Sequence, residues 1–127
     1  MSKWGEWVDD AVLRVLPREE RVGGDRVALV EPLRFIDVDA TLCTVPKGFE
    51  FDGASIPKPF WTLIGAPLEG NYVRSAALHD YGCAVRTEPS AVVHDRFYRS
   101  MRAEGVRWLQ AVLMYRAVRH FGPTWSV

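Results

Sequence analysis

The sequence predicts an α+β fold, in which a small antiparallel β-sheet formed mainly by residues 1–52 packs beside a helical part formed by residues 53–127. The first half alternates short β-branched segments with proline and glycine turns, and the second half has longer stretches of helical periodicity between capping residues. The chain has 127 residues, of which 48% are hydrophobic and 25% are charged, as is usual for one globular domain. We therefore expect residues 1–127 to form a single domain.

The expected strands are short and are separated by turn residues. Pro17 ends the first strand, Pro32 interrupts the chain between the second and the third, and a turn over 46–48 precedes the last. The segments predicted as strands are residues 11–16, 26–30, 33–38, 41–45 and 49–51.

The expected helices are bounded by recognisable start and stop signals. Ser55 is the expected N-cap of a short helix, and Gly105 and Gly122 end the third and the fourth. The second and third helices are expected to run antiparallel, and the last, apolar nearly all round, is expected to be the central buried helix. The segments predicted as helices are residues 57–64, 71–85, 90–103 and 106–121.

Charge is balanced overall but divided along the chain. Residues 1–52 carry eleven acids and seven bases, whereas residues 53–127 carry five acids and nine bases. The zero net charge argues against a specific or general nucleic-acid binder. The basic second half is either a solvated helical surface or a face for a phospholipid membrane.

Three observations bear on the cellular compartment in which the protein is found. No apolar run approaches the roughly 18 residues of a membrane span, and the first ten residues lack the layout of a signal peptide. Cys43 and Cys83 are too few for a disulfide framework, so we expect two free thiols and a reducing compartment.

Two His-Asp pairs are the first candidates for chemistry. On a helical wheel, His79 lies away from the apolar face of its segment, and Asp80 lies about 100° further round. Such neighbours can supply an imidazole for proton transfer and a carboxylate for a cation. The alternative is a surface histidine beside an acid that caps a helix or pairs with an arginine. His94 is expected in the core, and His120 in the last turn of its helix is expected to offset the helix dipole.

The loop that begins at Asp52 and Gly53 is the second candidate. A hard cation such as Ca²⁺ needs oxygen ligands, and a glycine lets the backbone curl to present its carbonyls. The alternative is a turn in which Asp52 or Ser55 caps the following helix.

Four segments together resemble a family of short phage and prophage proteins that has no settled activity. They are VPKGFEFDGASIP (residues 45–57), ALHDY (77–81), DRFY (95–98) and MYRAVRHFG (114–122). The resemblance implies a phage-associated protein, located in the cytoplasm of the host cell or in the virion, with other phage structural proteins as partners.

The central part of the chain also resembles prokaryotic secreted phospholipases A2. The order Asp52-Gly53-x-Ser55, then His79-Asp80-Tyr81-Gly82, then Asp95-x-x-Tyr98 matches that family's loop and two helices. The resemblance implies that His79 is the general base that activates water and that Asp95 orients it. It also implies that Asp52, Gly53 and Asp80 hold Ca²⁺.

Departures from the phospholipase pattern bear on this implication. The two cysteines that pair in that family fall on Ala54 and Ala76, and a tyrosine of the motif falls on Cys83. The sequence thus leaves two principal hypotheses: a Ca²⁺-dependent phospholipid ester hydrolase used in lysis or entry, or a non-catalytic phage structural or assembly protein. A phosphohydrolase built on the two His-Asp pairs is a weaker third, because only His120 remains as a further histidine.

Overall fold

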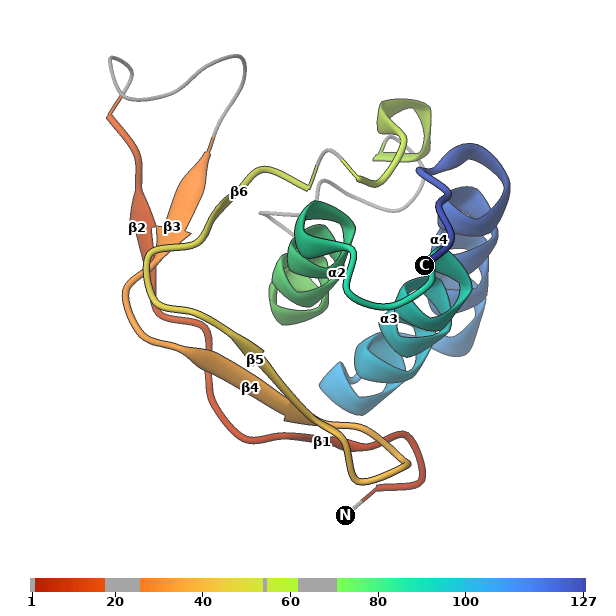
Figure 1. Ribbon diagram of the computed structural model, residues 1–127, viewed down its shortest axis with the longest axis horizontal. Helices are drawn as coiled ribbons and strands as arrows, with labels where there is room; N and C mark the ends of the chain where they lie inside the picture. Colours follow the sequence, from red (N-terminus) through yellow and green to blue (C-terminus); the bar gives the residue numbers. More distant parts are fainter. Residues whose placement is uncertain (1, 18–25, 54, 62–70) are drawn as a thin grey trace.

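Strands precede helices in the structure, which confirms the α+β fold. The structure is a computed structural model, and it describes residues 2–17, 26–53, 55–61 and 71–127. Within these ranges the strands form one side of the molecule and the helices the other, with α2 (Val73–Val85) between the strands and the remaining helices (Figure 1).

The strands in the described ranges form two three-stranded antiparallel sheets instead of the single sheet that was expected. One has the order β1 (Glu6–Trp7), β4 (Leu33–Ile36), β5 (Leu42–Val45). The other has the order β2 (Leu13–Val15), β3 (Val27–Leu29), β6 (Glu50–Phe51). The break between β3 and β4 falls at Pro32, which has no N–H to continue a ladder. The two-residue strand β1 was not expected, because a segment this short carries no alternating pattern.

The described part of the helical half contains a short 3₁₀ turn and three longer helices. The turn η2 spans Lys58–Phe60, and the other helices are α3 (Ser90–Glu104) and α4 (Trp108–Phe121). The expected helix over 57–64 is thus represented by η2, and its part beyond residue 61 lies outside the described residues.

The helices α2 and α3 run antiparallel, as expected. The start of α2 meets the end of α3, because Glu104 accepts hydrogen bonds from the N–H groups of Arg74 and Ser75 at 3.1 and 3.0 Å. The middle of α2 meets the first half of α3, where His79 lies against His94. Since α2 has no N-cap side chain of its own, Glu104 satisfies the free N–H groups of its first turn.

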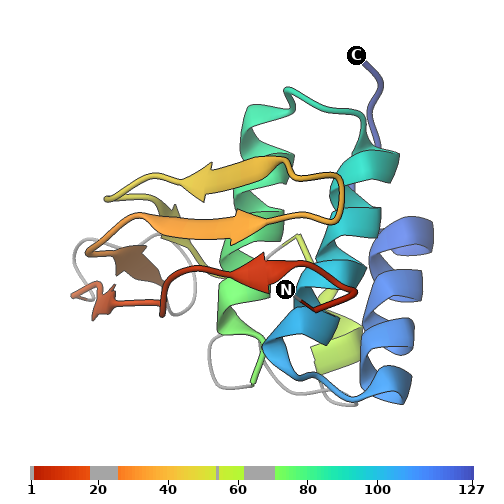
Figure 2. The ribbon, with the colours of Figure 1, turned by 90° about the horizontal axis from the view of Figure 1, so that it is seen from below.

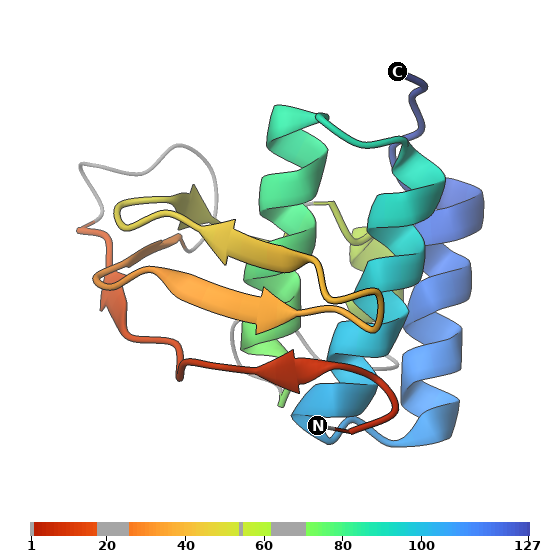
Figure 3. The same cartoon turned by 60° about the horizontal axis from the view of Figure 1, so that its bottom comes forward.

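The expectation that the last helix is the central buried helix is wrong. Only one face of α4 is buried, whereas Trp108, Leu109 and Leu113 on the opposite face are exposed. The helix lies on the side of α3 remote from the strands, so that α3 is the middle helix of the three (Figures 2 and 3). The helix α4 has apolar residues also on the face that α3 does not cover, so its apolar sequence did not mean that it is buried on every side.

A buried carboxylate fastens the first sheet to the helices. Asp37, directly after β4, accepts hydrogen bonds from Arg96 at 2.8 Å and from Arg99 at 2.8 and 2.9 Å. Arg96 also donates to Glu88. These arginines hold the pKa of Asp37 down at about 2, against the opposing effect of burial.

Candidate functional site

The centre of the candidate site is His79, which the fold buries between α2 and α3. Its side chain is 1% exposed, and its ring stacks on Phe97 of α3 with 4.5 Å between centroids. Burial, and next the proximity of His94, lower the pKa of His79 to about 3, so the imidazole is neutral near pH 7. The alternative of a surface histidine is therefore excluded.

A chain of hydrogen bonds fixes which nitrogen of each imidazole carries a proton. His94 Nε2 lies 2.9 Å from the carbonyl oxygen of Pro123, which can only accept, so Nε2 of His94 is the protonated nitrogen. Nδ1 of the neutral His94 is then an acceptor, and His79 Nε2, at 2.8 Å, must donate to it. Nδ1 of a neutral His79 is consequently left with a free lone pair, directed at the hydroxyl of Ser55 2.9 Å away.

Ser55 stands between two acceptors with one proton to give. Its Oγ contacts Nδ1 of His79 and also hydrogen-bonds with Oδ1 of Asp80. For both contacts to be hydrogen bonds at once, a second proton must be present on Asp80 or on His79. With that proton, donors and acceptors alternate without a break from Asp80 through Ser55, His79 and His94 to Pro123.

The carboxylate of Asp80 closes the loop that begins at residue 52. Besides Ser55, it accepts a hydrogen bond from the N–H of Gly53 at 2.8 Å. Burial raises the pKa of Asp80 to about 6, and the nearby charge of Asp52 acts in the same direction. The loop and α2 are therefore held together by a carboxyl group that titrates near neutrality.

The described part of this loop does not fit the calcium site that the phospholipase resemblance implies. Gly53 turns its N–H toward Asp80, and its carbonyl accepts from the N–H of Ile56 at 2.9 Å. A cation requires oxygens where Asp80 instead meets donors. Among the described residues, no three His, Cys, Asp or Glu side chains are grouped to hold a metal ion. We derive no chemical step through calcium.

The position of Asp95 corrects one expected contact. Instead of orienting His79, Asp95 accepts a hydrogen bond from the hydroxyl of Tyr115 at 2.6 Å and lies 4.0 Å from Arg119, both on α4. Successive helical residues point about 100° apart, so only one of the neighbours His94 and Asp95 can face α2. Because His94 does, it takes the place that the resemblance gave to Asp95.

Three residues of the site were missed in the analysis of the sequence. Ser55 was assigned to a helix cap and His94 to the core, and Cys83 was expected only to be a free thiol. The sulfur of Cys83 lies 3.8 Å from Nε2 of His79. Its i, i+4 spacing from His79 was the available signal. Burial raises the pKa of Cys83 to about 12, so it is a neutral thiol.

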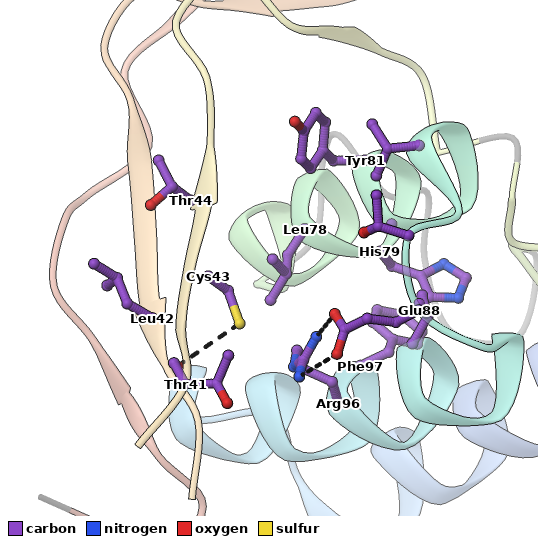
Figure 4. Close-up of a pocket in the computed structure, with 14 residues that line it drawn as sticks. Thr41, Leu42, Cys43, Thr44, Leu78, His79, Tyr81, Glu88, Arg96 and Phe97 are labelled. Carbon is purple, nitrogen blue, oxygen red and sulfur yellow. Dashed lines mark hydrogen bonds and ion pairs between the residues drawn. The ribbon is translucent and has the colours of Figure 1, made fainter. Parts of the chain in front are cut away.

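A depression in the surface gives access to the site. It measures about 400 Å³, and its wall includes Ser55, Asp80 and Cys83 together with Asp52 and Phe49. A second cavity, of about 190 Å³, lies between β5 and the helices α2 and α3. Figure 4 shows Cys43 of β5 facing the Arg96–Glu88 ion pair there, with the imidazole of His79 turned away from β5. His79 is among the residues that line this second cavity, and its Nδ1 is connected to the first depression through Ser55.

Comparison with known proteins assigns the chain to a family. A family model described as a protein of unknown function, DUF1353, matches residues 27–118. The chain belongs to this family. The matched segment of DUF1353 contains Ser55, His79, Asp80 and His94, whereas Pro123, the final acceptor of the hydrogen-bond chain, lies beyond it.

Two curated relatives come from Sinorhizobium fredii (strain NBRC 101917 / NGR234). The protein called "Uncharacterized protein y4jT" is 42% identical over 93 residues, which cover 73% of this chain and 28% of the relative. The protein called "Uncharacterized protein y4iH" is 34% identical over 92 residues, which cover 72% of this chain and 38% of the relative. The chain thus spans about a third of the length of these relatives. No solved structure matches it.

Proposed function

We propose that this DUF1353 protein hydrolyses a carboxylic ester, with Ser55 as nucleophile and His79 as general base. The observation that carries the proposal is the contact of 2.9 Å between Ser55 Oγ and the lone pair on His79 Nδ1, at the wall of a surface depression. His94 supplies the third element, since it holds the other nitrogen of His79 at 2.8 Å. A nucleophile, a base and a group that orients the base are the requirements of covalent acyl transfer.

The proposed reaction uses only protons and groups that the site contains, together with substrate and water. Ser55 Oγ attacks the acyl carbon while its proton passes to Nδ1 of His79, and a tetrahedral intermediate forms. As the ester bond breaks, His79 gives that proton to the departing alkoxide, and an acyl-serine remains. Water then attacks the acyl carbon with His79 again as base, which releases the acid and restores Ser55.

Asp80 has a positioning role in this proposal. Its carboxylate hydrogen-bonds with Ser55 and anchors the loop through Gly53. When ionised, it also offsets the positive charge that develops on His79 as the proton is transferred. This compensation matters because the buried imidazole is otherwise a weak base.

The class of substrate rests on the resemblance to phospholipases A2. Calcium, which the same resemblance implies, has no part in the proposed reaction. We propose a phospholipid acyl ester as substrate and a phage-associated setting in lysis or entry. The structure departs from the phospholipase pattern in giving His79 a serine hydroxyl in the position where that family activates water.

The test combines covalent labelling with hydrolysis. A fluorophosphonate, which transfers its phosphonyl group to an activated serine with loss of fluoride, is expected to label Ser55, as located by mass spectrometry. Hydrolysis of a nitrophenyl ester and of phospholipid vesicles is measured with calcium and with chelator. The variant Ser55→Ala is expected to lose labelling and activity, and His79→Gln to lose about 10²–10⁴-fold. Ser126→Ala, at an exposed serine, is the control.

Each alternative mechanism has its own outcome in this test. Calcium-dependent hydrolysis that survives Ser55→Ala but not His79→Gln would overturn the serine mechanism in favour of water activation at a calcium site. Wild-type protein without labelling and without hydrolysis under either condition would overturn the enzymatic proposal.

The second candidate is a non-catalytic phage structural or assembly protein. One observation favours it: both nitrogens of His79 and both carboxylate oxygens of Asp80 already have hydrogen-bond partners within the protein. Such a satisfied network can serve solely to hold the loop, α2 and α3 together. In that case His79→Gln lowers the free energy of unfolding and there is no activity to lose.

A further inference from the structure

The outward face of α4 differs from a usual solvated helix surface. Its first two turns expose Trp108, Leu109 and Leu113, and Trp108 and Leu109 are each 60% exposed. Its last two turns expose Arg116, Arg119 and His120. We name these six residues the α4 outer face. They share one side of the helix, opposite the buried residues Ala111, Met114, Ala117 and Val118.

The charge of this face is of one sign. The helix α4 contains no Asp or Glu between Trp108 and Phe121, and Arg107 directly precedes it. Arg107 and Arg116 make no ion pair with any residue in the described ranges, and Arg119 reaches Asp95 only at 4.0 Å. The arginine side chains are therefore available to an anion outside the molecule.

A groove of aromatic residues continues the face toward α3. It measures about 500 Å³, and its lining includes Trp4, Tyr98 and Tyr115 together with Arg99, Arg116 and one acid, Asp95. Trp4 and Tyr98 meet edge to face with 5.6 Å between ring centroids, and Arg102 lies over the ring of Trp4. Tryptophan and tyrosine beside arginine are typical of protein surfaces at the boundary between lipid and water.

We propose that the α4 outer face binds the surface of an anionic phospholipid bilayer. Trp108, Leu109 and Leu113 enter the boundary between headgroups and acyl chains, and Arg116 and Arg119 contact lipid phosphates. A nucleic acid would leave the exposed leucines without a contact, since its backbone offers phosphates but no apolar layer. The exposed aliphatic side chains and the single sign of charge together favour the bilayer.

Binding is measured on vesicles that cannot be hydrolysed, so that the result does not depend on ester hydrolysis. Wild-type protein is sedimented with vesicles of ether-linked phosphatidylcholine, with and without about 30% ether-linked phosphatidylglycerol. The expected result is at least tenfold tighter binding to the anionic vesicles, weakened by added salt. Each of Arg116→Gln and Arg119→Gln is expected to weaken binding about fivefold, since one arginine contributes about 1 kcal/mol at such a surface.

Matched controls show whether the effect is specific to the α4 outer face or would follow from replacing any exposed leucine or arginine. Leu109→Ser is expected to weaken binding at least fivefold, whereas Leu42→Ser, at a leucine of β5 that is 58% exposed, leaves it within twofold. Arg34→Gln, on β4, is the corresponding charge control, because the exposure of its side chain, 47%, is close to the 43% of Arg119. Circular dichroism confirms that every variant is folded.

Three results would overturn the proposal. The first is no preference of the wild type for anionic vesicles. The second is equal weakening by Leu42→Ser and Leu109→Ser. The third is a competing occupant: tighter binding to duplex DNA or RNA than to the vesicles, or a dimer in solution that Leu109→Ser converts to monomer.

Discussion

The pKa values of His79 and Asp80 are shifted in opposite directions by the fold. We therefore expect that, as the pH falls, a variant without Asp80 loses stability and a variant without His79 gains it. The pKa of His79 is lowered from 6.5 to about 3, so the stability linked to this residue is complete above pH 6.5 and declines as the pH falls from there toward 3. The pKa of Asp80 is raised from 3.8 to about 6, so its linked stability is complete below pH 3.8 and declines as the pH rises through 6.

The size of each effect follows from the two pKa values. As the pH falls from 7 to 5, His79 lowers the free energy of unfolding by about 2 kcal/mol, because the imidazole stays neutral in the folded protein but takes up a proton in the unfolded chain. As the pH falls over the same interval, Asp80 raises the free energy of unfolding by about 1 kcal/mol, because Asp80 binds its proton at a higher pH in the folded protein than in the unfolded chain. In the wild type these contributions largely cancel. His79 is fully buried, whereas Asp80 is partly exposed in the wall of the depression, so solvent screens Asp80 more than His79.

Two variants separate the contributions. Asp80→Asn retains the His79 effect and is expected to lose about 2 kcal/mol between pH 7 and pH 5, whereas His79→Gln retains the Asp80 effect and is expected to gain about 1 kcal/mol. Urea unfolding at both pH values gives the four free energies required. The difference between the two variants, about 3 kcal/mol, is free of every titrating group that they share, His94 included. Changes that agree within about 1 kcal/mol would refute the assigned burial and protonation of the pair.

Four further predictions concern packing, acid stability and thiols. Ser55→Ala leaves His79 Nδ1 and Asp80 Oδ1 without their shared partner and is expected to lower the free energy of unfolding by about 2–4 kcal/mol; a change below about 0.5 kcal/mol would contradict the network. Gly82→Ala places a Cβ 2.8 Å from Val93, and is expected to cost about 1–3 kcal/mol, with a smaller cost in a Val93→Ala background, as urea unfolding of the double variant will show. Asp37→Asn is expected to remove about 2 kcal/mol of stability that the wild type has above pH 3.8 and loses as the pH falls through 2, and the two proteins should therefore converge in acid. Thiol titration should count two groups after denaturation and react slowly before it, because burial raises the pKa of Cys43 to about 11 and of Cys83 to about 12; a count of zero without reductant would disprove free thiols.

The sequence was sufficient where local patterns decide the structure. The helices α2, α3 and α4 and strands β2 to β6 were located to within a few residues, because capping residues, prolines and alternation act over short distances. Division of the strands into two sheets could not be foreseen, since it depends on which edges meet across the fold.

Within the site, the sequence identified the helix that carries His79 and Asp80 and the loop that meets it. It did not identify the hydrogen-bond partners of His79 and Asp80. A hydrogen bond between two helices depends on how the helices are rotated relative to each other, and the helical wheel of one segment does not give that rotation. His94 was placed in the core correctly, yet burial concealed its contact with His79. The exposure of α4 was missed for a similar reason, because an apolar sequence does not determine whether another element of the fold covers those residues.

The carbonyl of Pro123 gives the row of hydrogen bonds at the site its polarity. Because this oxygen can only accept, the bonds from His79 to His94 and from His94 to Pro123 must both point toward the C-terminal segment, and a neutral His79 then offers Ser55 a lone pair. Pro123 lies outside residues 27–118, the segment that the family model matches, so the direction of the row is set by a group beyond that segment. A relative with a donor at this place would have the same two histidines pointing in reverse, and its serine would then face an N–H instead of a base.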